Sequence, residues 1–171
     1  MASYVAKVAR QCEEATETKE LDLTDCDLTS VPHAVYHILR ETTVQSATFS
    51  NNKLKSVPGR LCSAFGGVSH LNFSGNRITT LPMEFAELQE LLTLDLSKNK
   101  LSNIPDGIVV LQKLESLCLD DNEITSVDWQ DLRARIPTLK QVSISNNPLS
   151  VDSRLQASTI PSLTIVLEKG G

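Results

Sequence analysis

The chain has 171 residues, 40% of them hydrophobic, which suits one domain with a continuous core. Its formal net charge is -5 and its pI is near 5.2, so it has no excess of Lys and Arg with which to neutralise a phosphate backbone, and nucleic-acid binding is disfavoured. No run of about 18 apolar residues occurs, which disfavours a membrane span.

An amphipathic helix is predicted at the start of the chain, over about residues 2–16. Apolar residues recur there at helical spacing and would share one face. They are Val5, Val8, Ala9 and Cys12. We expect this face to close one end of the core. The segment lacks the apolar stretch of about 7 to 15 residues that a signal peptide needs, so we expect an intracellular protein, in the cytoplasm.

The cysteines are scattered along the chain and form no CxxC pair. In a reducing compartment such cysteines remain free thiols. We therefore expect neither a disulfide nor a zinc site. The residues concerned are Cys12, Cys26, Cys62 and Cys118.

One short pattern recurs along the chain. Its clearest copies are TLDLSKNKLSNIP, from Thr93 to Pro105, and HLNFSGNRITTLP, from His70 to Pro82. Each copy contains one anchor residue, and successive anchors are 23 to 26 residues apart. The anchors are Cys26, Asn52, Asn76, Asn99, Asn122 and Asn147. About six repeats are therefore predicted over residues 18–152.

Two apolar residues precede each anchor by five and three positions, as Leu94 and Leu96 precede Asn99. This alternation is typical of a short strand with one buried face, and successive copies predict parallel strands. The chain then turns inward, where an unpaired backbone group costs roughly 1 to 3 kcal/mol. An asparagine amide has both a donor and an acceptor, so it can satisfy the turns above and below. The anchors are thus predicted to form a structural ladder that accepts the small, buried Cys26 only in the first copy.

The segment after each strand predicts a helical turn on the opposite side. Four copies carry an apolar residue followed by proline, which is favoured at the first position of a helical turn. These pairs are Val31-Pro32, Val57-Pro58, Leu81-Pro82 and Ile104-Pro105. The fifth copy has Asp128 and Trp129 instead, and Asp128 is a suitable N-cap for a helix that ends near Arg135. Trp129 is then either a core residue of that helix or an exposed interaction anchor.

A cap is predicted at the C-terminal end, because a terminal repeat would otherwise expose its apolar face. Leu155 and the apolar stretch from Leu163 to Leu167 predict a degenerate last strand. Residues 153–171 would form this cap and a tail, with Gly170 and Gly171 disordered.

These Leu, Asn and Leu-Pro columns resemble the leucine-rich repeat family, in particular its small intracellular type, over residues 18–168. The resemblance implies an α/β fold, a right-handed leucine-rich repeat solenoid with a curved parallel sheet on the concave side and short helices and turns on the convex side. Residues 1–171 would be a single domain, in which a capping helix at 1–17 precedes the repeats. A ligand-binding concave face is also implied, but no binding residues of the family can be carried over.

The outward residues of the predicted strands would form this concave face. Small hydroxyl residues dominate it, and it lacks the Trp, Tyr and Arg that are enriched at binding hot spots, so it binds weakly, binds narrowly or is unused. The candidate protein-binding residues are Asp22, Thr48, His70, Asn72, Thr93, Asp95, Cys118, Asp120 and Ser143. The main hypothesis is a non-catalytic scaffold or adaptor that binds an unknown neutral or basic protein through this face. The alternative is a regulatory or inhibitory subunit that acts through the N-terminal helix or the convex face.

No residue pattern predicts catalysis, a metal or a cofactor. His33 and His37 are four residues apart, but their spacing fixes no third ligand. No recognisable motif places a nucleophile near His70. Asp120 and Asp121 lack the ligand spacing of a calcium loop and are expected to be exposed. We therefore expect no enzyme, but a monomer that binds a protein and neither nucleic acid nor membrane.

Overall fold

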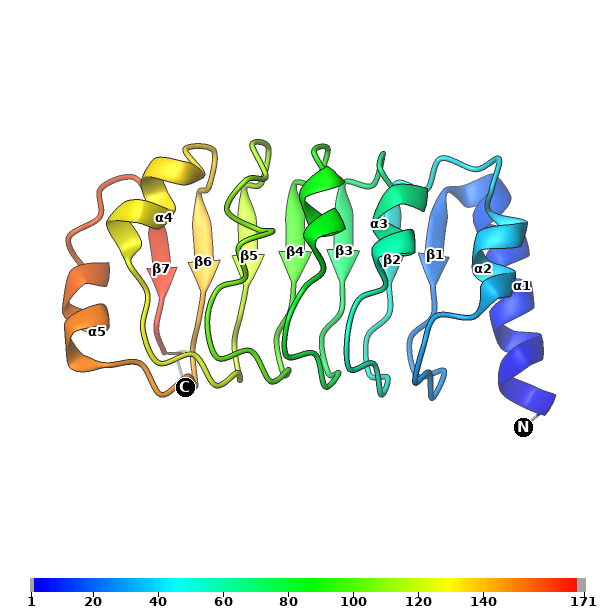
Figure 1. Cartoon of the computed structure of the whole chain (residues 1–171), viewed down its shortest axis with the longest axis horizontal. Coiled ribbons are helices and arrows are strands. Elements are labelled where there is room, and N and C mark those ends of the chain that lie inside the picture. Colours follow the sequence, from blue (N-terminus) through cyan, green and yellow to red (C-terminus); the bar gives the residue numbers. More distant parts are fainter. Residues whose placement is uncertain (1, 169–171) are drawn as a thin grey trace.

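The computed structural model describes residues 2–168. They contain a seven-stranded parallel sheet whose strands follow in chain order from β1 to β7 (Figure 1). The strands are β1 (Glu20–Asp22), β2 (Ser46–Thr48), β3 (His70–Asn72), β4 (Thr93–Asp95), β5 (Ser116–Cys118), β6 (Gln141–Ser143) and β7 (Thr164–Val166). All neighbours pair in register, so Leu94 lies between Leu71 and Leu117. The predicted parallel strands are confirmed.

The middle residue of each strand points into the core, as the alternation predicts. Leu71, Leu94 and Leu117 are buried, and the apolar residue two positions further on is buried as well. In the second and third repeats these later residues are Phe49 and Phe73, whose rings stack with centroids 5.1 Å apart. The core is therefore a continuous apolar column behind the sheet.

Each anchor asparagine joins its own repeat to the preceding one. Asn76 accepts a hydrogen bond at Oδ1 from the Leu54 N–H (3.0 Å), and its Nδ2 donates to the carbonyls of Phe49 and Phe73 (both 2.9 Å). Equivalent bonds are made by Asn52, Asn99, Asn122 and Asn147. The amides thus pair backbone groups that would otherwise be buried without partners.

The first anchor differs because no repeat precedes it. The backbone N–H groups of Cys26 and Leu28 donate to Asn52 Oδ1 at 3.1 and 2.9 Å, so the ladder begins with the second repeat. On the other side, Lys7 of the N-terminal helix donates through Nζ to the Thr24 carbonyl (2.7 Å). A lysine of the cap therefore takes over part of the role that an asparagine has elsewhere.

Short helices lie on the other side of the sheet from its outward face (Figure 1). They are α2 (His33–Ile38), α3 (Gly59–Ala64), the 3-10 helix η1 (Met83–Glu87), α4 (Trp129–Arg135) and α5 (Val151–Ala157). α4 begins as predicted, since Asp128 accepts a hydrogen bond from the Asp131 N–H (2.9 Å). Trp129 is fully buried and donates to the Ser153 carbonyl (2.7 Å), so it is a core residue and not an exposed anchor. After Pro105 the fourth repeat has turns only.

The N-terminal helix α1 (Ala2–Thr18) packs against β1 and α2 at one end of the sheet (Figure 1). Its buried face consists of Val8, Cys12 and Ala15. The prediction that Val5 belongs to this face is wrong, because the first turn of α1 extends beyond the core and leaves Val5 56% exposed. Ala9 is only partly buried.

At the C-terminal end, α5 and β7 follow the last anchor. Leu155 lies on α5 and is 64% exposed, so the prediction that it belongs to a last strand is wrong. Leu163 is buried just before β7, which is formed by the predicted apolar stretch. Gly170 and Gly171, which were predicted to be disordered, lie outside the described residues.

Candidate functional site

The outward face of β2 to β5 contains a shallow groove with a volume of about 400 Å³. Its side chains come from equivalent positions of four successive strands, which the in-register pairing stacks above one another. The outward-facing residues that line it are Ser46, Thr48, His70, Asn72, Thr93, Asp95, Ser116 and Cys118. Six of the candidate residues therefore lie together in this groove, which we call the concave groove.

The other candidates lie elsewhere. Asp22 is exposed on β1 and Ser143 is half-buried on β6, and neither lines the concave groove. Conversely, Ser46 and Ser116 line it, although they were not among the candidates. Their outward strand position was the available signal in the sequence, but a lone serine carries no distinctive chemistry.

Several candidates stabilise the backbone of their own turn. Asn72 Oδ1 accepts a hydrogen bond from the N–H of Ser74, and Asp95 Oδ1 accepts one from the N–H of Ser97, both at 2.8 Å. These bonds form local turns of the kind that Asn and Asp favour. Asn72 and Asp95 are thus structural residues as well as surface residues, and replacing them would disturb the turns.

The expectation that Asp120 is exposed is wrong. Only 3% of its surface is accessible, and Oδ1 accepts hydrogen bonds from the Ser143 hydroxyl and the Ser145 N–H, both at 2.7 Å. The chain already bends inward at this position, where the next repeat stacks against it. Asp120 therefore connects two repeats and is a poor candidate for partner binding. Asp121 is half-buried.

The charges of the concave face are acidic. The described strands β1 to β7 carry the carboxylates of Glu20, Asp22 and Asp95 and contain no Lys or Arg. Hydrogen bonds from the Thr24 hydroxyl and N–H hold the pKa of Asp22 below its usual value, so this carboxylate is ionised at neutral pH. The face therefore attracts positively charged surfaces and repels negatively charged ones.

Two side chains of the concave groove, His70 and Cys118, are of the types that act as a base or a nucleophile in active sites. His70 Nδ1 lies 2.8 Å from Thr93 Oγ1. Burial, reinforced by the charges of Asp95 and Asp120, raises the pKa of the Cys118 thiol from 9.0 to about 11. A thiol that is neutral at pH 7 is a weak nucleophile and a weak metal ligand.

The histidines outside the groove do not form a ligand cluster. His33 Nδ1 lies 3.3 Å from an Arg60 guanidinium nitrogen, and that guanidinium stacks on the Tyr36 ring at 4.6 Å from its centroid. His37 is exposed. Within residues 2–168, no three His, Cys, Asp or Glu side chains converge in a way that could hold a metal ion.

Comparison with known proteins agrees with the repeat pattern. A family model described as leucine rich repeat matches residues 43–101 and 89–149. The chain belongs to the leucine-rich repeat family. Leucine-rich repeat-containing protein 20 of Mus musculus is 45% identical over 161 residues, which cover 92% of this chain and 87% of that protein. The Homo sapiens protein of the same name is 36% identical over 95 residues, which cover 53% of this chain and 52% of that protein.

A solved structure has the same leucine-rich repeat architecture. In the crystal structure of the TLR13-ssRNA13 complex, one chain superposes with a TM-score of 0.72 at 24% identity, covering 87% of this chain and 21% of that chain. At this identity the likeness concerns the fold alone, and this chain spans about a fifth of that chain's length. The predicted α/β leucine-rich repeat solenoid is confirmed. The described residues include no helix with the length and apolar character to cross a membrane.

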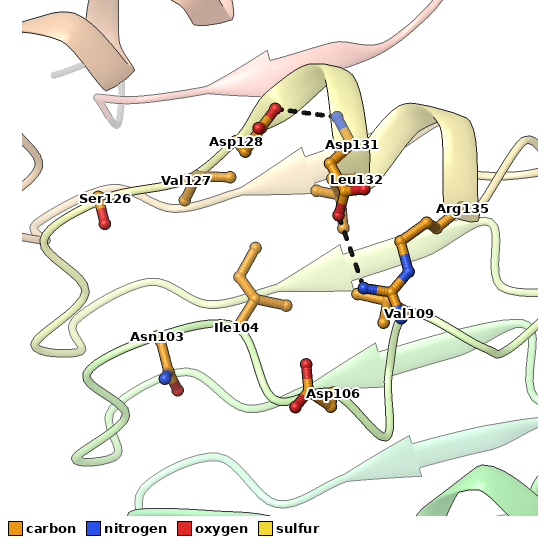
Figure 2. A pocket seen from close by; sticks show the side chains of 10 residues that line it. All are labelled: Asn103, Ile104, Asp106, Val109, Ser126, Val127, Asp128, Asp131, Leu132 and Arg135. Atoms are coloured by element: carbon orange, nitrogen blue, oxygen red, sulfur yellow. Dashed lines mark hydrogen bonds and ion pairs between the residues drawn. The ribbon is translucent and has the colours of Figure 1, made fainter.

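A second hollow, of about 160 Å³, lies between the fourth and fifth leucine-rich repeats on the helical side (Figure 2). One side is formed by the turns of the fourth repeat and the other by α4. It is lined by Asn103, Ile104, Asp106, Val109, Ser126, Val127, Asp128, Asp131, Leu132 and Arg135. The sequence pattern did not predict it, although the missing proline at Asp128 and Trp129 marked the fifth repeat as different.

Proposed function

We propose that this leucine-rich repeat protein is a non-catalytic scaffold that binds another protein through the concave groove. The observation that carries the proposal is the groove itself, in which side chains from four in-register strands line a continuous open surface. Family membership supports it at the level of a protein-interaction module.

The chemistry of the groove suits a partner that supplies the large side chains. Ser46, Thr93 and Ser116 are small and leave room, whereas binding energy in interfaces is concentrated in Trp, Tyr and Arg. Such residues would therefore come from a protruding loop or helix of the partner. The carboxylate of Asp95 in the groove, and that of Asp22 outside it on β1, favour a partner surface that is neutral or basic.

The test places bulk and positive charge in the groove without disturbing the fold. Ser46 and Ser116 line the groove, and their hydroxyls form no hydrogen bond with another residue in the described part of the chain. The double variant Ser46→Arg/Ser116→Arg should therefore fold and lose the partner. The matched control Gln130→Arg/Gln156→Arg adds the same charge at exposed helix positions.

Quantitative affinity capture from cells, with wild type and both double variants compared by isotope labelling, measures the outcome. We expect partners of the wild type to drop more than about tenfold with the serine variant, since each 1.4 kcal/mol of lost binding energy is a factor of about ten. They should persist with the glutamine control. Equal recovery with both double variants would refute binding in the groove.

A regulatory subunit that acts through α1 is the second candidate. It is favoured by two exposed apolar side chains on that helix, Tyr4 (40%) and Val5 (56%). Deleting α1 would uncover the first repeat, so the suitable variant is Tyr4→Ser/Val5→Ser, which leaves the buried face intact. Loss of the partner with this variant, and its retention with Ser46→Arg/Ser116→Arg, would replace the first proposal by the second.

We also propose that the protein is a cytoplasmic monomer. All four cysteines are free, and Cys12, Cys26 and Cys62 are buried among apolar residues, which suits a reducing compartment. Light scattering of the purified protein tests the monomer, and microscopy of the tagged protein in cells tests the compartment.

A further inference from the structure

The hollow in Figure 2 lies where two adjacent repeats differ in secondary structure on the helical side. The fourth repeat crosses the helical side with turns only, in which the N–H groups of Ile108 and Leu111 donate to the carbonyls of Pro105 and Ile108 (3.0 and 3.1 Å). The fifth repeat carries the full helix α4 (Trp129–Arg135). A crevice remains between α4 and the turns of the fourth repeat (Figure 2).

Another hollow adjoins this crevice on the side of the third repeat. It has a volume of about 280 Å³, extends to Leu81 and Met83 and shares Asn103, Ile104 and Asp106 with the first. We call the two hollows together the convex trough. The convex trough is bordered by three successive repeats, so it offers a ligand contacts from Met83 of the third repeat to α4 of the fifth.

The bottom of the convex trough is apolar. The part beside α4 is lined by Ile104, which is partly exposed, and by Val109, Val127 and Leu132, which are at most 7% exposed and form its floor. At the other end Met83 is 89% exposed and adds apolar surface. Methionine adapts its shape readily and is common at surfaces that bind varied partners.

The rim of the convex trough is acidic. Three carboxylates face it, those of Asp106, Asp128 and Asp131. Arg135 supplies the single cation among the lining residues, and its Nη1 lies 3.6 Å from Oδ2 of Asp131 (Figure 2). Asp128 is occupied as the N-cap of α4. Asp106 is exposed and forms no hydrogen bond or ion pair with another described residue, so its carboxylate is available to a ligand.

We propose that the convex trough binds a segment of a partner protein in which Lys or Arg lies next to apolar side chains. The apolar side chains pack on Ile104 and Met83, while the cation meets Asp106 and its aliphatic stem covers the adjoining apolar surface. The convex trough shares no residue with the concave groove. Together with the concave interface proposed above, on which this step rests, the convex trough would give the scaffold two separate docking surfaces, so that it could hold two proteins at once.

The binding test uses short synthetic peptides of alternating leucine and lysine, with leucine-glutamate and serine-lysine peptides as controls. Isothermal titration calorimetry on the full chain should detect binding of the leucine-lysine peptide only. In spectra of the 15N-labelled protein, amide shifts should concentrate between Asn103 and Val109 and on α4. Equal binding of the leucine-glutamate peptide, or shifts confined to β2–β5, would overturn the proposal.

Two matched pairs of variants separate steric and electrostatic contributions. Asn103→Trp fills the region common to both hollows and should abolish binding, whereas Ser56→Trp, at the equivalent exposed position two repeats earlier, should not. Asp106→Lys should weaken binding about tenfold. Glu17→Lys makes the same charge change on α1 and should leave it unchanged.

All four substituted positions are exposed, so the variants should fold, and circular dichroism verifies this. Binding that survives Asn103→Trp, or that falls equally with Asp106→Lys and Glu17→Lys, would show general attraction of a basic peptide to an acidic protein and would overturn the proposal.

Discussion

Replacing Asn99 by alanine removes one complete rung of the asparagine ladder. Asn99 is buried, with only 3% of its surface accessible to solvent. Its Oδ1 accepts from the Ile78 N–H (2.9 Å), and its Nδ2 donates to the carbonyls of Phe73 (2.9 Å), Leu96 (3.0 Å) and Ser97 (3.2 Å). Alanine can make none of these bonds.

The backbone groups that bind Asn99 do not contribute equally to the loss of stability. The carbonyls of Phe73 and Leu96 retain hydrogen bonds from the amides of Asn76 and Asn122, both at 2.9 Å. The Ile78 N–H loses the acceptor that Asn99 supplied, and a buried, unpaired donor costs roughly 1 to 3 kcal/mol. With the small hole left by the amide, we expect the free energy of unfolding to fall by about 2 to 3 kcal/mol.

Urea denaturation followed by Trp129 fluorescence and by circular dichroism measures this change. Both probes are needed because repeat proteins unfold cooperatively only while neighbouring repeats stay coupled. Asn103→Ala is the matched control, since Asn103 is exposed in the same repeat and should cost less than about 0.5 kcal/mol. If the two variants have the same free energy of unfolding, the ladder does not stabilise the fold as argued.

Further predictions concern the core and the thiols. Leu94→Asp puts a carboxylate between buried leucines and should cost about 3 to 5 kcal/mol, so soluble, folded variant protein would contradict the inward assignment. Trp129→Phe removes the bond to the Ser153 carbonyl and should lower the free energy of unfolding by about 1 to 2 kcal/mol, measured by circular dichroism. Burial raises the pKa of Cys12 to about 11 and that of Cys62 to about 12, from 9.0. The unfolded state therefore releases these protons first, and stability should fall as the pH rises above 9, whereas a flat profile between pH 9 and 11 would contradict this burial.

The sequence by itself determined the architecture within each repeat. Pairs such as Leu94 and Leu96 specify a strand with one buried face, and Asn99 specifies the inward turn, because both signals are local and recur in every repeat. The N-cap Asp128 likewise predicted where α4 begins. These features need no knowledge of what lies beside the repeat.

Only the tertiary structure decided how neighbouring repeats meet. Asp120 is buried because Ser143 and Ser145 of the following repeat lie against it, and Trp129 is buried because α5 places the Ser153 carbonyl beside its indole. In the sequence these partners are 23 to 25 residues apart, and no local pattern connects them.

The same reason explains what was missed on the surface. The outward strand positions were predictable, but the choice of Ser46 and Ser116 as lining residues depends on which strands surround the concave groove. The convex trough depends on how α4 packs beside the turns around Asp106. Alternation and helical spacing describe one element at a time, whereas a groove or crevice is a relation between repeats that becomes defined only when they stack.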